Sequence, residues 1–129
     1  MTSIAAEKTH SPAPIDLMAA FDSFTDSWSP RVAATYNQND VMLVRLTGPF
    51  HWHTHADTDD LFLVLSGELD IELRDRIVTL KAGQLFVVPA GVEHRPVARG
   101  EVRVLIMEPT GTPNTGDPDT AAPRKLLGT

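Results

Sequence analysis

The ten residues HWHTHADTDD, at positions 51–60, hold three of the chain's five histidines at alternate positions, together with three aspartates. Because the sequence has no cysteine, a transition-metal site in this protein must use nitrogen and oxygen ligands. Residues two apart in a β-strand point to the same face, so the rings of His53 and His55 can converge on one cation. His51 shares this parity and could be a further imidazole, a proton shuttle or a substrate contact. The stretch is therefore either part of a metal site or a polar loop that is rich in histidine.

A metal site would need further ligands from outside this pair. Asp60 comes five residues after His55, at the head of the next apolar run, where its carboxylate can complete one side of a site. His94 follows the Pro-x-Gly turn of VVPAGVEH, and a rigid turn just before a histidine can aim its ring. The remaining histidine, His10, lies in an N-terminal stretch that we expect to be mobile. His94 is therefore the candidate for the fourth ligand.

Short β-strands must position these residues, because apolar side chains recur with a period of two after Pro30. Turn-forming pairs such as Gly48-Pro49 and Ser66-Gly67 separate the apolar runs. The predicted strands lie near residues 31–37, 41–46, 50–55, 61–65, 68–73, 77–81, 84–88, 94–98 and 102–107. Strands at this spacing, with no helix between them, predict an antiparallel sandwich or barrel rather than a fold of alternating strands and helices.

The two ends of the chain have other patterns. A short helix is predicted between Ile15 and Trp28, because apolar residues recur there at spacings of three and four. It should end at Ser29-Pro30, since the residue before a proline is driven out of the helical conformation. We therefore divide the chain into an N-terminal arm and short helix at 1–30, a β-barrel at 31–109 and an extended C-terminal tail at 110–129.

Composition narrows the class of protein and of partner. The chain has 129 residues, enough for one domain with a single core, and a formal net charge of −6. This charge disfavours a nucleic-acid or anionic-membrane partner. The sequence contains no apolar run long enough to span a membrane, and its N-terminus lacks the apolar core of a signal peptide. We therefore expect a cytoplasmic protein with neither a nucleic-acid nor a membrane partner.

Two motifs resemble those of the cupin superfamily. GPFHWHTHADTDDLFLVLSG, at residues 48–67, is similar to the first cupin motif, and GQLFVVPAGVEH, at residues 83–94, is similar to the second. The longer pattern resembles small single-domain bacterial cupins that are often labelled mannose-6-phosphate isomerase-like. The resemblance implies an all-β double-stranded β-helix, or jelly-roll barrel, with a short N-terminal helix. It also implies a divalent transition metal (zinc, manganese, iron or nickel) held by His53, His55, Asp60 and His94.

The sequence departs from the first cupin motif at Asp60, where the motif normally has glutamate. Aspartate is one methylene shorter, so the carboxylate could bind the metal weakly, through water or not at all. Asp59 or Asp57 could take its place, or the site could consist of three histidines and water. A cupin that binds no metal is the extreme form of this departure.

The expected function follows from the resemblance and from metal chemistry. A metal with open coordination positions can polarise a carbonyl or hydroxyl, lower the pKa of bound water, or bind dioxygen if it is iron. We expect a metal-dependent enzyme acting on a small polar metabolite, of the isomerase, epimerase, lyase or dioxygenase type. The alternative is a non-catalytic module that binds a small ligand or a metal. No cluster of basic residues for a substrate phosphate is evident in 51–60, which weakens the isomerase label.

Neutral imidazoles bind metals and protonated imidazoles do not, so metal binding should weaken as the pH falls through about 6.5. Metal content measured after dialysis at pH 5 should be lower than after dialysis at pH 7.5. Equal contents would count against histidine ligands.

A homodimer is expected from the pattern of one strand. Leu61, Leu63 and Leu65 have the opposite parity to Phe62 and Val64, so both faces of this strand are apolar. An apolar outer face must be covered by the helix, by a second sheet or by a partner chain.

Overall fold

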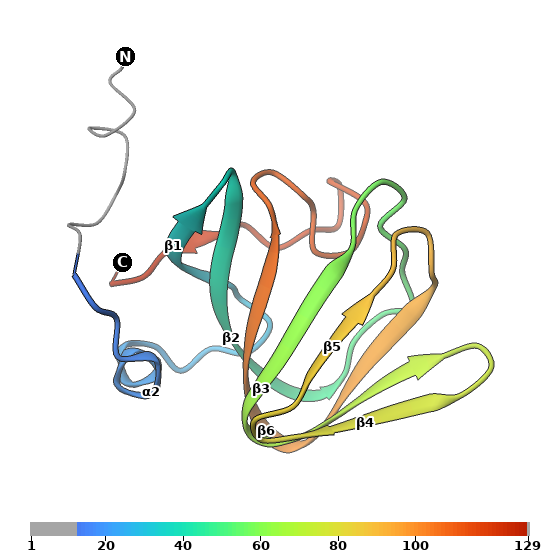
Figure 1. Cartoon of the computed structure of the whole chain (residues 1–129), viewed down its shortest axis with the longest axis horizontal. Helices are drawn as coiled ribbons and strands as arrows, with labels where there is room; N and C mark the ends of the chain where they lie inside the picture. The colour runs from blue at the N-terminus through green and yellow to red at the C-terminus, as the bar shows by residue number, and fades with distance from the viewer. Residues whose placement is uncertain (1–12, 129) are drawn as a thin grey trace.

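The computed structural model describes residues 13–128, whose regular structure is almost entirely β (Figure 1). Its strands are β1 (Arg31–Tyr36), β2 (Asn39–Pro49), β3 (Asp60–Leu73), β4 (Ile77–Lys81), β5 (Leu85–Val88), β6 (His94–Pro109) and β7 (Lys125–Leu126). They form one sheet in the order β4-β3-β6-β2-β1-β7, with β5 also paired to β3. The sheet bends over on itself and encloses a core without pairing between its edge strands in the described chain. This confirms the predicted all-β jelly-roll fold.

Two long strands, β3 and β6, carry the bend. The first half of β3 pairs with β5 and its second half pairs with β4, while β6 pairs with β3 in both halves. The predicted strands at 61–65 and 68–73 are therefore two halves of one strand, as are those at 94–98 and 102–107. The predicted turn residues Ser66-Gly67 lie at register shifts within β3. The strand is bent at these residues and not interrupted, since its pairing with β6 continues on both sides of them.

Gly67 allows two backbones to approach at this bend. It has a φ of +87°, and a Cβ placed on it would lie 2.6 Å from the carbonyl oxygen of Glu101. Gly83 also has a φ of +87°, but a Cβ there would meet nothing within 4 Å. Gly83→Ala should lower the free energy of unfolding by roughly 1 to 2 kcal/mol through backbone strain alone. Gly67→Ala adds a steric clash with the backbone, so this variant should lower the free energy of unfolding by about 1 to 3 kcal/mol more than Gly83→Ala does. Equal chemical-denaturation midpoints for the two variants would contradict this role of Gly67.

The core lies on the concave side of the sheet, where alternate side chains of each strand point inward. Val64, Leu69, Ile71 and Val104 are completely buried there. Two ligand candidates lie where these strands begin, because Asp60 is the first residue of β3 and His94 is the first residue of β6. Their side chains are buried at that end of the core.

The predicted N-terminal helix is present but shorter than expected. α2 (Leu17–Ala20) is continued by one 3₁₀ turn, η1 (Phe21–Ser23), and the side chain of Asp16 caps α2 at the amide of Ala19. The prediction that the helix reaches Trp28 is wrong. Residues 24–28 contain Thr, Asp and Ser, whose side chains favour turns over helix interiors.

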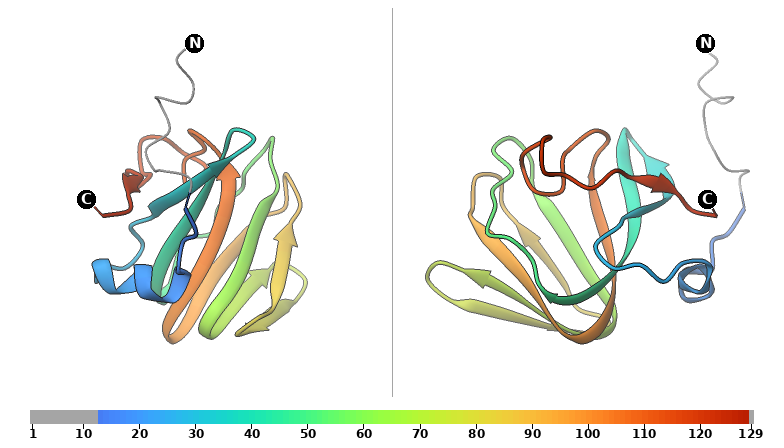
Figure 2. Two further views of the ribbon diagram at one scale, coloured as in Figure 1. Left: turned by 60° about the vertical axis from the view of Figure 1, so that its left-hand side comes forward. Right: turned by 180° about the vertical axis from the view of Figure 1, so that it is seen from behind.

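Arg45 of β2 holds the segment after the helix against the outer face of the sheet. Its guanidinium donates to the carbonyl oxygens of Phe24 at 2.9 Å and Phe21 at 2.7 Å. Both phenyl rings are buried against Leu43 in a small second core. The helix therefore covers one end of the outer sheet face (Figure 2).

The C-terminal segment crosses one end of the strands before β7 pairs in parallel with β1 (Figure 2). Arg124 anchors it, donating to the carboxylate of Asp40 at 2.8 Å and to the carbonyl oxygen of Pro109 at 3.1 Å. The predicted N-terminal mobile arm, with His10, lies largely outside the described residues. None of the helices in residues 13–128 is long and apolar enough to cross a membrane.

Candidate metal centre

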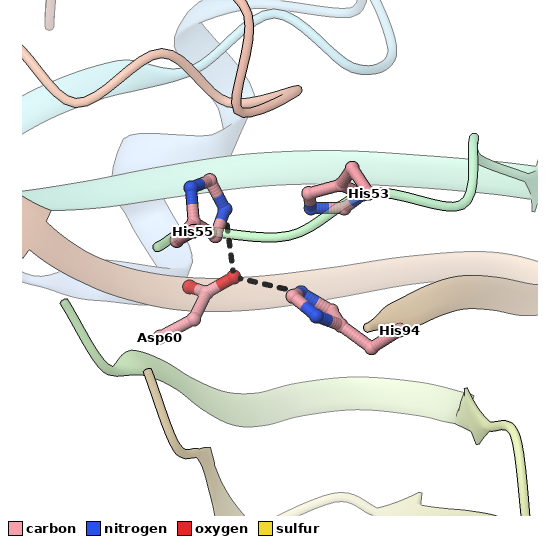
Figure 3. Close-up of side chains that lie close together, drawn as sticks. All are labelled: His53, His55, Asp60 and His94. Atoms are coloured by element: carbon pink, nitrogen blue, oxygen red, sulfur yellow. Dashed lines mark hydrogen bonds and ion pairs between the residues drawn. The ribbon is translucent and has the colours of Figure 1, made fainter. Parts of the chain in front are cut away.

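His53, His55, Asp60 and His94 lie together at one end of the core (Figure 3). One ligand atom from each residue lies within 4.8 Å of the others, and all four residues are buried. Protein nitrogen and oxygen ligands lie about 2.0 to 2.2 Å from an ion such as zinc, so two on opposite sides are roughly 4 Å apart. The spacing of the four residues therefore suits one ion with only small closing movements.

The backbone holds the histidines in place, although not as the sequence predicted. Residues 50–55 were expected to form a strand, and the structure has only a single pair of residues there, in which His53 and His94 exchange two backbone hydrogen bonds of 3.0 Å. The carbonyl of His55 accepts a hydrogen bond of 2.8 Å from the amide of Gly91, in the turn before His94. The segment thus lies beside the start of β6 but is too irregular to form a ladder. The predicted convergence of His53 with His55 arises from these separate anchors rather than from strand parity.

Backbone carbonyls also set the orientation of two imidazole rings. Nδ1 of His53 lies 2.9 Å from the carbonyl oxygen of His51, and Nδ1 of His94 lies 2.9 Å from that of Val92. A carbonyl oxygen can only accept, so each Nδ1 carries the proton and each Nε2 has a free lone pair. This is the arrangement that metal-binding histidines commonly have. The ring of His51 is exposed and lies outside the cluster, so His51 contributes its carbonyl rather than its imidazole.

Asp60 is the aspartate that joins the cluster. Its Oδ2 lies 3.2 Å from Nε2 of His94 and 3.5 Å from Nε2 of His55. Burial alone would raise the pKa of this carboxyl, but its contacts with the two imidazoles outweigh burial and lower the pKa. Asp57 and Asp59, which could have replaced it, are exposed, and Asp59 accepts a hydrogen bond from the amide of Ala90.

Acceptor atoms of this cluster face one another, and this arrangement favours a positive charge between them. Nε2 of His94 and an ionised Asp60 are both acceptors, so their 3.2 Å contact needs either a shared proton or a cation. Asp60 Oδ1 and both ring nitrogens of His55 are buried without a hydrogen-bond partner within the described chain. An unpaired buried acceptor is costly, and a cation would satisfy the Asp60 carboxylate and the one ring nitrogen of a neutral His55 that accepts. The group could therefore hold a divalent metal, and its donor set suits zinc, manganese, iron or nickel.

Sequence reasoning missed Glu108. This carboxyl is buried at the end of β6, with Oε2 at 3.3 Å from Nε2 of His55 and Oε1 at 3.4 Å from the guanidinium of Arg124. Burial, and then the charge of Asp60, raise the pKa of Glu108 to about 8. The predicted strand ended at Met107, one residue too early. The signal that could have found Glu108 is the inward alternation of Val102, Val104 and Ile106, which it continues.

Burial also changes the expected response of one ligand candidate to pH. It lowers the pKa of His53 to about 4, because the charged imidazolium is poorly solvated inside the protein. A proton can compete with a metal for this nitrogen only near or below that pKa. Competition at His53 is therefore expected at lower pH than the value of about 6.5 for a free imidazole.

Comparison with known proteins identifies the family. The family described as Cupin domain matches residues 42–108, which include Asp60, His94 and Glu108. The chain is a cupin. The matched span runs from Met42 in β2 to Glu108 near the end of β6, so it contains the four-residue cluster and most of the core.

This cupin is similar in sequence or structure to three further proteins. It is 43% identical over 70 residues to the uncharacterized protein YdbB of Bacillus subtilis (strain 168), a match covering 54% of this chain and 60% of that protein. It resembles the crystal structure of a cupin-2 domain containing protein from Shewanella frigidimarina with 46% identity and a TM-score of 0.73, covering 74% of this chain and 93% of that one. Protein NMB1881 of Neisseria meningitidis is 25% identical, with a TM-score of 0.69, over 76% of this chain and 100% of that one.

Proposed function

We propose that this cupin is a metal-dependent enzyme acting on a small molecule. The observation that carries the proposal is the buried group of His53, His55, Asp60 and His94, which brings one possible ligand atom of each residue close to those of the others. Three neutral imidazoles and one carboxylate would leave two positions of a six-coordinate ion open for water or a substrate. Such a metal supplies Lewis acidity toward a bound oxygen, or dioxygen chemistry if it is iron.

The surrounding residues support catalysis beyond metal storage. Glu108 presents an unpaired carboxyl oxygen beside His55, and it lines the same cavity as Asp60. A carboxyl group in this place can accept a proton from a bound substrate or donate one to it. Gly116 of the C-terminal segment lies so close to the loop beneath it that a Cβ there would be only 2.2 Å from the carbonyl oxygen of Thr54. The segment is therefore packed directly against the histidine loop at this point.

Isomerase, epimerase, lyase and dioxygenase chemistry can each use a metal with an open position. A proton-transferring group such as Glu108 would serve the first three of these. Membership of the mannose-6-phosphate isomerase-like group and a cytoplasmic location stay predictions.

The test compares zinc-, manganese-, nickel- and iron-loaded protein with protein stripped by a chelator. Oxygen uptake is followed with an electrode, and isomerisation, epimerisation and elimination are followed by proton NMR on pooled small metabolites. We expect turnover in at least one metal-loaded form and none in the stripped protein or in His94→Ala. Protein that binds the metal at full occupancy and turns over nothing would favour the non-catalytic module. Protein that binds no metal would contradict the proposal entirely.

We also propose a homodimer formed through the outer face of the sheet. Two rows of apolar side chains cross that face in register: Val87, Leu61, Met107 and Val41 in one, and Leu85, Leu63, Leu105 and Leu43 in the other. The helical segment covers Leu43, whereas Leu85 is 53% exposed and Val87 is 37% exposed. Among the described residues β5 pairs only with β3, so its other edge is also free to bind a strand of a second copy.

Leu85→Glu should shift the dimer toward monomer, because it places a charge in the apolar face of each subunit. Ile77→Glu is the matched control, since Ile77 is a similarly exposed apolar residue, on β4. Sedimentation at micromolar concentration should show a dimer for the unsubstituted protein and for Ile77→Glu, and a monomer for Leu85→Glu. A monomeric unsubstituted protein, or an unchanged Leu85→Glu dimer, would contradict this interface.

A further inference from the structure

Glu108 places a second buried carboxyl group beside the ligand cluster. Its side chain is 3% exposed, and its Oε2 has no hydrogen-bond partner within residues 13–128. That oxygen lies 3.3 Å from Nε2 of His55, which also has no hydrogen-bond partner among these residues. The two atoms are therefore in contact without being hydrogen-bonded to each other. A buried carboxylate oxygen in this state is costly, and a cation is one means of satisfying it.

The contact between Glu108 and His55 has the length expected of two neighbouring ligands of one ion. Oδ2 of Asp60 lies 3.2 Å from Nε2 of His94 and 3.5 Å from Nε2 of His55. The distance of 3.3 Å between Glu108 and the same nitrogen of His55 falls within this range. Neighbouring ligands of an ion with bonds of about 2.1 Å are roughly 3.0 Å apart in an octahedron and roughly 3.4 Å apart in a tetrahedron.

Asp60 and Glu108 also border one small cavity on the inner side of the cluster. The cavity measures about 40 Å³, and His53 is a third potential ligand in its lining. Because one water needs at least about 10 to 15 Å³ of such space, the cavity can hold an ion or a few waters and nothing larger. Neither lysine nor arginine is among the described residues of the lining. A divalent cation would balance the two carboxylates here, since buried charges are stable when they are paired or bind a metal.

The side chain of Glu108 must move to reach an ion held by the cluster, because it lies outside the group whose ligand atoms are all within 4.8 Å of one another. Its contact with Arg124 does not prevent this movement, since the nearest atoms are 3.4 Å apart. Arg124 has shorter contacts elsewhere, at 2.8 Å with Asp40 and 3.1 Å with the carbonyl oxygen of Pro109. The C-terminal segment therefore stays anchored when Glu108 moves.

We propose that Glu108 is a fifth metal ligand that compensates for the short side chain of Asp60. Asp60 is one methylene shorter than the glutamate of the first cupin motif, and Glu108 supplies a second carboxylate from the end of β6. It takes one of the two positions that the cluster leaves open on a six-coordinate ion, so one position remains for water or a substrate. Binding through Oε2 leaves Oε1 available for proton transfer. The inference rests on the proposed function for the presence of the metal.

A second carboxylate ligand should favour manganese over zinc. Carboxylate oxygens suit manganese, which is commonly bound by six ligands, whereas zinc in proteins is usually held by four. Zinc can therefore be held without Glu108, but manganese loses one of its oxygen ligands. A carboxylate that acted through its charge alone would stabilise the two divalent ions equally. The ratio of the two affinities thus separates a ligand from a nearby charge.

The test measures the binding of manganese and zinc to the full chain by titration calorimetry at pH 7.5. Glu108→Gln keeps the shape of the side chain but removes its charge. Glu101→Gln is the matched control, because Glu101 lies on the same strand and its side chain is 84% exposed. We expect Glu108→Gln to weaken manganese binding by at least about tenfold and zinc binding by less than about threefold. Glu101→Gln should bind both metals as the unsubstituted protein does.

Equal losses of manganese and zinc affinity in Glu108→Gln would show an effect of charge and overturn the inference, as would the loss of neither. Should this variant not fold, a crystal of the unsubstituted protein loaded with manganese decides. Oε2 of Glu108 should then lie within about 2.5 Å of the anomalous peak, and a separation above about 3 Å would overturn the inference. Metal bound by the cluster without Glu108 would leave the proposed function standing. Protein that binds neither metal would contradict both.

Discussion

Replacement of His94 by alanine is expected to weaken metal binding by more than about 100-fold, since loss of even an outer partner of a metal ligand commonly costs 10- to 100-fold. The ring of His94 is almost completely buried, and its Nε2 faces Asp60 at 3.2 Å. The backbone hydrogen bonds between residues 53 and 94 do not involve this ring, so the loop beside β6 should keep its place. Affinity is measured by competition with a chromogenic chelator at pH 7.5.

His51→Ala is the matched control for this experiment. It removes an imidazole from the same loop, but one that is exposed and outside the cluster, and its carbonyl still accepts from His53. His51→Ala should bind metal as the unsubstituted protein does. His94→Gln, which fills more of the space, guards against misfolding of the alanine variant. Unchanged affinity in both folded His94 variants would show that this residue is not a ligand.

Asp60→Asn is expected to lower the metal affinity by at least about tenfold, because it removes a negative charge from a buried site and keeps the shape of the side chain. Oδ2 of Asp60 is in contact with the imidazoles of His55 and His94. Glu108, the other carboxylate beside the cluster among the described residues, contacts only His55. Asp60→Glu restores the residue that the first cupin motif normally has, and it should bind metal more tightly than Asp60→Asn. Chelator competition measures all three proteins.

Asp57→Asn is the control for Asp60→Asn, because Asp57 is exposed and lies outside the cluster. The same loss of affinity in both variants would point to a general effect of charge. Full affinity in Asp60→Asn would mean that the metal is held by the histidines and water, one of the alternatives that the sequence left open.

Much of the fold could be predicted because alternation and turn chemistry are local properties. β4 has the predicted bounds, and every other predicted strand except that at 50–55 overlaps an observed one. The sequence does not show whether a glycine ends a strand or bends it. Gly67 bends β3 because a partner strand, β6, continues on both sides of it, and that partner comes some thirty residues later in the chain.

The sequence predicted which four residues form the cluster, but only partly how the backbone brings them together. His53 and His94 were expected to meet, and they do so through one backbone pair in an irregular segment. Glu108 was missed because its importance depends on burial next to His55 and on Arg124, which arrives from the C-terminal segment. Trp28 was assigned to a helix, and the structure places it in the cavity wall. Contacts of this kind depend on tertiary packing, which periodicity does not report.

The most direct test of the metal centre is a crystal of the zinc-loaded protein measured at wavelengths on either side of the zinc absorption edge. The anomalous difference map should contain one strong peak per chain, enclosed by the side chains of His53, His55, Asp60 and His94. A peak at another place, or no peak between these four residues in fully loaded protein, would contradict the assignment.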